Sequence, residues 1–240
     1  MIKFFRSIRQ NLLNEGKTSK YLKYAIGEII LVVIGILIAL EINNWNQNNS
    51  NKKLEMQYYA SMKSQLNEDL TKLNGEIYYN QDLLNKFSYA KNLLIQKDKS
   101  KMDTLAKITL SMVNYADFRQ KSNVFQTLVN SGEIKYINNK KILEHFQSLE
   151  ENYNYINRIE DSNLTVIIFQ VVPEIKEVVR IDPLKVENVE ILFSYQFQNG
   201  LELLIHLVNE KKDAYLHAKN EIENTIDLID QELGSNANKQ

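Results

Sequence analysis

Residues 29–40 read IILVVIGILIAL, a run of twelve residues without a polar side chain. Extending this run to residues 25–42 gives a segment of 18 residues in which Glu28 and Glu41 are the only charged side chains. A bilayer core requires about 20 predominantly apolar residues in a helix, so this length fits a single crossing. We therefore predict one transmembrane helix over residues 25–42, with both carboxylates near the interfaces.

The charge on the two sides of this segment predicts its orientation. Residues 1–24 carry a formal net charge of +5 and the rest of the chain −6, which gives −1 in total. The positive-inside rule places the basic end in the cytoplasm. Only Ala39 resembles a signal-peptide cleavage position, so we predict an uncleaved signal anchor in the cytoplasmic membrane, with the C-terminal domain in the periplasm. A cleaved signal peptide is the alternative.

The basic segment, residues 1–24, has a pattern of its own. Residues 2–13 read IKFFRSIRQNLL, with apolar side chains at helical spacing and arginines between them. This pattern is typical of a short amphipathic helix on an anionic membrane surface, although a disordered basic tail is the alternative. Gly16 would end this helix, and Thr18 or Ser19 would cap the spanning helix.

The composition of the remaining chain favours helices. The sequence has no cysteine, two prolines and seven glycines. The lack of cysteine excludes disulfides and thiolate metal sites, and the few helix breakers favour long helices over a turn-rich β fold. We predict an all-α protein in which residues 43–240 form a long-helix bundle ectodomain. Its acidic charge argues against binding to nucleic acid.

A heptad pattern begins at residue 59 and predicts the first long bundle helix. One heptad position holds Tyr59, Leu66, Leu73, Asn80, Phe87 and Leu94. The other apolar position holds Leu70, Ile77 and Leu84. Polar residues interrupt the seam, so we expect bundle packing rather than a two-stranded coil. Whether the membrane helix continues into this helix through the Asn-rich residues 43–51 is left open.

Further helices follow this one. The segments that we expect to be helical are 103–116 (capped by Asp103 or Thr104), 123–130 (after Ser122), 139–172 (capped by Asn138 or Asn139), 186–198 and 201–233. Gly132 would stop the second of them, and Pro173 would kink or end the third. Residues 181–183 would form a turn, and residues 199–200 would break the last two helices apart.

Residues 5–46, FRSIRQNLLNEGKTSKYLKYAIGEIILVVIGILIALEINNWN, resemble the start of a family of uncharacterised single-span membrane proteins common in Bacteroidota. Downstream, the segment FQTLVNSGEIKYI at residues 125–137 is also comparable, but the rest shares only a helical pattern. The resemblance implies a single-span envelope protein with a helical ectodomain. It implies no catalytic residues.

Candidate sites for chemistry are few. The chain has no nucleotide-binding glycine motif, no GxSxG and no HExxH, so we expect no enzyme activity and no cofactor. His206, Glu210, Asp213 and His217 share one helix face, but the two histidines lie roughly 16 Å apart along the axis and cannot bind one ion together. A solvated polar face explains them better, so we expect no metal site.

One stripe of the apolar segment suggests self-association. Glu28, Val32, Gly35 and Ala39 follow 4, 3, 4 spacing, and Gly35 with Ala39 forms a small-xxx-small pair. Such pairs let two helix backbones approach closely in lipid. These four residues are a candidate transmembrane interface, and the chain a candidate homo-oligomer.

Together these patterns predict a membrane-anchored, non-enzymatic scaffold or interaction subunit of the bacterial cell envelope. Its partners would be the lipid bilayer and another envelope protein. The alternative is a helical bundle that senses a ligand and signals through a partner protein. An interior cavity with convergent polar groups would favour the second function.

Overall fold

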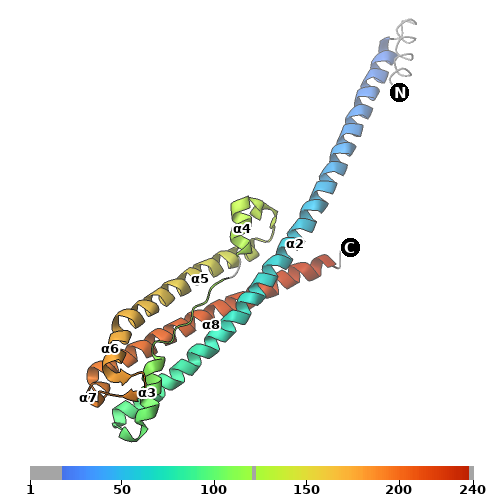
Figure 1. Cartoon of the computed structure of the whole chain (residues 1–240). Coiled ribbons are helices and arrows are strands. Elements are labelled where there is room, and N and C mark those ends of the chain that lie inside the picture. The colour runs from blue at the N-terminus through green and yellow to red at the C-terminus, as the bar shows by residue number, and fades with distance from the viewer. Residues whose placement is uncertain (1–17, 121–122, 238–240) are drawn as a thin grey trace. The chain divides into compact units, whose positions relative to one another are not determined.

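The computed structural model describes residues 18–120 and 123–237 and shows an all-α protein (Figure 1). The chain divides into two compact units, Met1–Glu55 and Met56–Gln240. Its helices and strands, in order, are α2 (Thr18–Gln96), η1 (Lys99–Lys101), α3 (Met102–Ser111), α4 (Val124–Ser131), η2 (Glu133–Tyr136), α5 (Lys140–Val166), the π-helical η3 (Ile167–Val171), α6 (Val172–Val178), β1 (Val179–Arg180), β2 (Lys185–Val186), α7 (Val189–Leu192) and α8 (Tyr195–Ala237).

The first unit contains the apolar run. Residues 29–40 lie within α2, and their side chains are exposed. The most apolar stretch of 18 residues in this helix has a mean hydropathy of 2.6, and none of it is buried. Among the described residues, α2 alone is long and apolar enough to cross a membrane.

Helical conformation continues through the Asn-rich residues 43–51, which answers the question that the sequence left open. Asparagine is a weak helix former, but no glycine or proline occurs between Gly35 and Gly75 to interrupt the helix. The amphipathic helix predicted over residues 2–13, and the stop at Gly16, lie outside the described residues.

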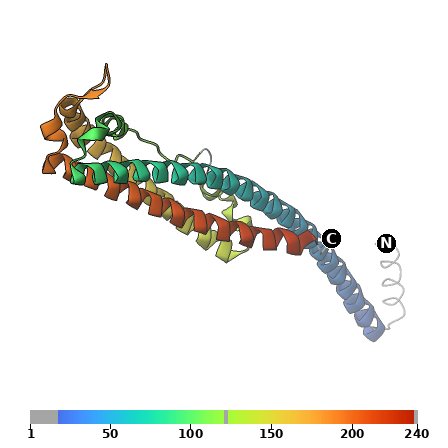
Figure 2. The same ribbon diagram turned by 90° about the horizontal axis from the view of Figure 1, so that it is seen from below.

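The second unit is a bundle of three long helices: residues 56–96 of α2, α5 and α8 (Figures 1 and 2). Its apolar core forms two clusters. One contains Tyr59–Leu73 of α2, Ile142–Ile159 of α5 and Ala214–Ile229 of α8. The other contains Leu83–Leu94 of α2, Ile167–Val171 of η3 and Phe197–Val208 of α8, with α3, α6 and β1. The order of the clusters makes α2 parallel to α5 and antiparallel to α8.

The heptad prediction is confirmed. All six residues of the first position are at most 1% exposed, and Leu84 of the second is 5% exposed; these are Tyr59, Leu66, Leu73, Asn80, Phe87, Leu94 and Leu84. Leu70 and Ile77 are partly buried against the first cluster. The seam faces α5 and α8 of the same chain, so bundle packing accounts for the pattern.

Several predicted boundaries need correction. The helix expected over residues 103–116 begins at Met102, after a 3-10 turn capped by Asp98, and ends at Ser111. The cap of α4 is Asn123, whose side chain accepts from Gln126 N. Two boundaries are confirmed: Asn139 caps α5, and Gly132 ends α4 in the left-handed region with φ 72°.

Helical conformation continues past Pro173, so the proline does not end the helix. Instead, the π-helical turn η3 precedes the proline, which then occupies the first turn of α6. Proline is tolerated there because the first backbone N–H groups of a helix have no intrahelical acceptor. The long helix predicted up to residue 172 is therefore divided into α5, η3 and α6.

The predictions for residues 186–200 are the least accurate. The expected helix 186–198 is replaced by β2, which pairs with β1, by the short helix α7, and by the start of α8. The expected break at residues 199–200 is absent, because α8 is helical from Tyr195 to Ala237. Gly200 instead allows the side chain of Glu174 to lie close to α8, because a Cβ atom at position 200 would lie 2.7 Å from Glu174 Oε2.

Candidate functional site

Residues 112–120, a turn at 112–113 followed by a segment without helix or strand, run beside the bundle and are called the strap here (Figure 1). It is needed because α2 ends beside the second apolar cluster whereas α5 begins beside the first, so the chain must return along the bundle. An extended backbone has no internal hydrogen bonds, and its polar groups must find partners elsewhere.

Side chains from all three long helices supply those partners. Phe118 N donates to Glu160 Oε1 of α5 at 2.7 Å, and Lys211 Nζ of α8 donates to Ala116 O at 3.0 Å. Lys72 Nζ of α2 donates to Arg119 O. Just beyond the strap, Val124 N donates to Gln65 Oε1 at 2.6 Å.

Two of these anchors belong to a polar layer that separates the two apolar clusters. Its members are Glu76 and Asn80 of α2, Glu160 and Asn163 of α5, and Lys211 of α8. On each helix the layer lies between the residues of the first cluster and those of the second. Four of its side chains are at most 3% exposed: Asn80, Glu160, Asn163 and Lys211.

Burial dominates the electrostatics of this layer. It raises the pKa of Glu160, although the bonds from Phe118 N and Tyr215 Oη, and the nearby Lys211, act in the opposite direction. Burial likewise raises the pKa of Glu76 and lowers the pKa of Lys211. Lys211 also lies 5.3 Å from the ring centre of Tyr115, whose pKa burial raises to about 12.

The polar layer positions the backbone of the strap and offers no obvious reactive group. Glu160 already accepts two hydrogen bonds, and Lys211 faces a carbonyl and an aromatic ring. Within residues 18–120 and 123–237, Asn80 Oδ1 and Asn163 Oδ1 are buried and accept no hydrogen bond. Leaving a buried acceptor without a hydrogen bond costs about 1–3 kcal/mol, so these two oxygens reduce the stability of the bundle.

The candidate metal ligands lie on α8, as the spacing predicted. Glu210, Asp213 and His217 line an open groove of about 340 Å³ with Asn152 and Tyr155 of α5, whereas His206 does not. Tyr155 Oη donates to Glu210 Oε1 at 3.2 Å. No group of three or more metal-ligating side chains occurs in the part of the chain that the structure describes.

The four residues of the candidate transmembrane interface lie in α2. Val32 is 56% exposed, Gly35 and Ala39 are exposed, and Glu28 is half-buried. A Cβ atom at Gly35 would meet nothing within 4 Å, so the position has room for a larger side chain in the isolated chain. Self-association through this stripe stays a prediction.

Replacing Gly35 with isoleucine tests that prediction in a membrane association assay on residues 17–50. We expect association to fall, because the β-branched side chain would keep two helix backbones apart. Leu37→Ile, on the opposite side of the helix, is the matched control and should leave association unchanged. Equal association of the native and Gly35→Ile spans would contradict the interface.

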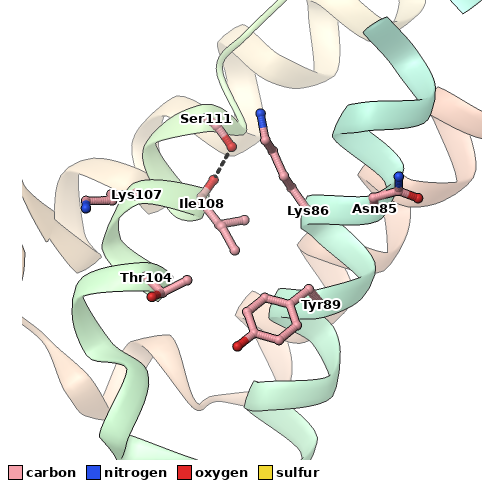
Figure 3. A pocket seen from close by; sticks show the side chains of 7 residues that line it. All are labelled: Asn85, Lys86, Tyr89, Thr104, Lys107, Ile108 and Ser111. Atoms are coloured by element: carbon pink, nitrogen blue, oxygen red, sulfur yellow. Dashed lines mark hydrogen bonds between the residues drawn. The ribbon is translucent and has the colours of Figure 1, made fainter. Parts of the chain in front are cut away.

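A second open groove, of about 510 Å³, lies between α2 and α3 (Figure 3). Ile108 and Tyr89 project into the space between the helices, and Lys86, Asn85, Thr104, Lys107 and Ser111 complete the lining. The Ser111 hydroxyl donates to Ile108 O at 2.6 Å within α3. Sequence analysis did not predict this groove.

Sequence reasoning also missed the polar layer, although one signal was available. Asn80 occupies a heptad position that is otherwise apolar, and a polar residue in such a seam often sets the alignment of helices. A second contact between α5 and α8 comes from His145, whose Nδ1 lies 2.7 Å from Glu221 Oε1.

The fold thus defines the class: an all-α protein with a three-helix bundle and an apolar, exposed helix near the N-terminus. A family model for DUF6090, a family of unknown function, matches residues 28–172, which is more than half of the chain, so the chain belongs to this family. The match covers residues 28–46 of the first segment noted above and all of the second, residues 125–137. It also continues through α5. No curated protein and no solved structure matches the chain.

Proposed function

We propose that this chain is a single-pass protein of the bacterial cytoplasmic membrane, whose bundle lies in the periplasm and acts as a non-enzymatic scaffold or interaction subunit. The observation that carries the anchoring is the apolar stretch of α2, where no residue of the 18-residue window is buried. Aliphatic side chains exposed over such a length are costly in water and favourable in lipid.

The buried polar side chains and the open grooves of the bundle support an interaction role over catalysis or ligand sensing. The buried side chains of Glu160 and Lys211 hydrogen-bond to the strap, and Glu160 also accepts from Tyr215 Oη, whereas neither Glu160 nor Lys211 lines one of the two grooves. Both grooves are open to solvent. Grooves that face outward offer surface to partners, which is what a scaffold requires.

The orientation has a direct test. A reporter that is active only outside the cytoplasm, fused after Gln240, should be active, because the basic residues 1–24 retain the N-terminus inside. The same reporter fused after Lys23 lacks the apolar segment and should be inactive. Activity of a cytoplasm-specific reporter at Gln240 would contradict the proposed topology.

The interaction role is tested by photo-crosslinking in native membranes from single exposed positions on the bundle, such as Tyr78 and Lys107. A discrete adduct with another envelope protein, found at some positions and absent at others, is the expected result. If the adducts contain only a second copy of this chain, the role of a subunit that connects different proteins is wrong.

A further inference from the structure

The turn that joins α2 to α3, with the adjoining helix ends, is a second basic segment of the chain after residues 1–24. Residues 86–107 contain six lysines and two aspartates, a formal net charge of +4, whereas the rest of the chain carries −5. Asp98 is engaged as the cap of η1, where it accepts from Ser100 N and Ser100 Oγ. It is therefore oriented toward its own turn.

Four of the six lysines have free ammonium groups at the surface. Lys97, Lys99, Lys101 and Lys107 are exposed, and within the described ranges none of them forms an ion pair. The other two are paired: Lys86 with Asp82 at 2.6 Å and Lys91 with Glu202 at 2.7 Å. The positive charge available to a partner is thus concentrated on η1 and the outer side of α3.

Of these four lysines, Lys107 lines the groove between α2 and α3, and its side chain lies on the side of α3 away from Tyr89 (Figure 3). The apolar surface of the groove comes from Ile108, which is 8% exposed, and from the ring of Tyr89, which is 45% exposed. Thr104 also lines the groove. A volume of about 510 Å³ accommodates an apolar side chain, and exposed lysines on the same turn and helix favour carboxylates next to that side chain.

We propose that the groove lined by Tyr89, Thr104, Lys107 and Ile108, together with Lys99 and Lys101 of the neighbouring turn η1, binds an acidic segment of a partner protein. One apolar side chain of that segment enters between Tyr89 and Ile108, and its carboxylates contact the lysines. An acidic protein segment supplies both the aliphatic or phenyl anchor that this concavity fits and the carboxylates that the lysines attract. The inference names a partner for the proposed interaction role and rests on it.

The test uses the full chain in nanodiscs of zwitterionic lipid and a fluorescent synthetic peptide rich in glutamate with one central phenylalanine. Two matched peptides replace the phenylalanine with serine or the glutamates with glutamine. We expect the first peptide to bind best, and its affinity to fall with added salt, because exposed charges are screened. Equal binding of the phenylalanine and serine peptides would overturn the groove as the anchor site.

Substitutions in the protein locate the contact. Lys107→Glu should weaken binding of the first peptide by about three- to tenfold, the range expected from loss and reversal of one exposed charge contact. Thr104→Trp should fill the groove and abolish the preference for phenylalanine over serine. Lys140→Glu, at an exposed position on α5, makes the same change of net charge and should have little effect.

Two outcomes would overturn the proposal. If Lys140→Glu weakens peptide binding as much as Lys107→Glu, the attraction is a general property of net charge. If Lys107→Glu reduces binding to phosphatidylglycerol vesicles but not to the peptide, the lysines recognise a lipid surface instead. Either result leaves the topology and the crosslinking tests of the proposed function unaffected, so the two failures are distinguishable.

Discussion

Leu73→Asp is expected to unfold the bundle, with a loss of roughly 4 kcal/mol or more in the free energy of unfolding. Leu73 is fully buried in the first apolar cluster, where α2 faces α5 and α8. An aspartate there would leave a cavity and place a carboxylate in an apolar environment. Because domains are typically stable by only about 5–15 kcal/mol, this loss removes much of the margin.

The measurement is urea unfolding of the full chain followed by circular dichroism. Asn74→Asp is the matched control, since it introduces the same carboxylate one residue further along α2 at an exposed position. The control should unfold within about 0.5 kcal/mol of the native chain. An unchanged unfolding midpoint for Leu73→Asp would mean that the heptad seam is not part of the core.

Glu160→Ala is the second substitution with a large expected effect, a loss of roughly 3 kcal/mol. It would leave Phe118 N and Tyr215 Oη without their acceptor and Lys211 without a neighbouring carboxylate. Glu160→Gln retains an acceptor oxygen and should cost less. Glu151→Ala, at an exposed position on the same helix, should be nearly neutral.

Limited proteolysis at neutral pH separates a local effect from a global one. Because Glu160 holds the strap, cleavage near residues 112–120 should accelerate in Glu160→Ala before the helices become susceptible. If the strap in Glu160→Ala is cleaved no faster than in the native chain, Glu160 does not anchor the strap.

The Glu160→Gln variant also tests a dependence on pH, because it removes the carboxyl group that titrates. Burial raises the pKa of Glu160 in the folded state above the ordinary value of 4.5, so the folded chain binds this proton more tightly than the unfolded chain. Protonation of Glu160 therefore contributes stability that increases as pH falls toward 4.5 and is lost as pH rises through the pKa of the folded state. Native stability relative to Glu160→Gln should increase on acidification from neutral pH. If the difference in the free energy of unfolding between the native chain and Glu160→Gln stays constant or decreases on acidification, this explanation is wrong.

The sequence predicted the long helices well because their signals are local and repeated. The heptad from Tyr59 to Leu94 repeats one burial pattern over five heptads. Asn139 has a side chain that accepts from the first backbone N–H groups of a helix, and Gly132 tolerates the left-handed conformation at a helix end. Membership of a family of unknown function is also confirmed, although the resemblance was noted chiefly over residues 5–46.

The features that were missed depend on contacts between distant residues. Gly200 resembles a helix breaker in isolation, yet its lack of a side chain makes room for Glu174, which lies 26 positions earlier. Similarly, Lys211 and Glu160 look like ordinary surface charges in the sequence, and only the path of the strap beside their helices gives them backbone partners. Nothing in the periodicity of α5 or α8 indicates that a backbone segment will require their hydrogen bonds.

The route of the strap has a consequence for the order in which the chain matures. Its anchors are separated by 42 residues from Phe118 to Glu160 and by 95 residues from Ala116 to Lys211. The ribosome synthesises α8 after α2 and α5, so the strap lacks its anchor at Lys211 until α8 has been made. Since closure of such long loops is slow, we expect the strap to become ordered late, after α2 and α5 have formed as helices.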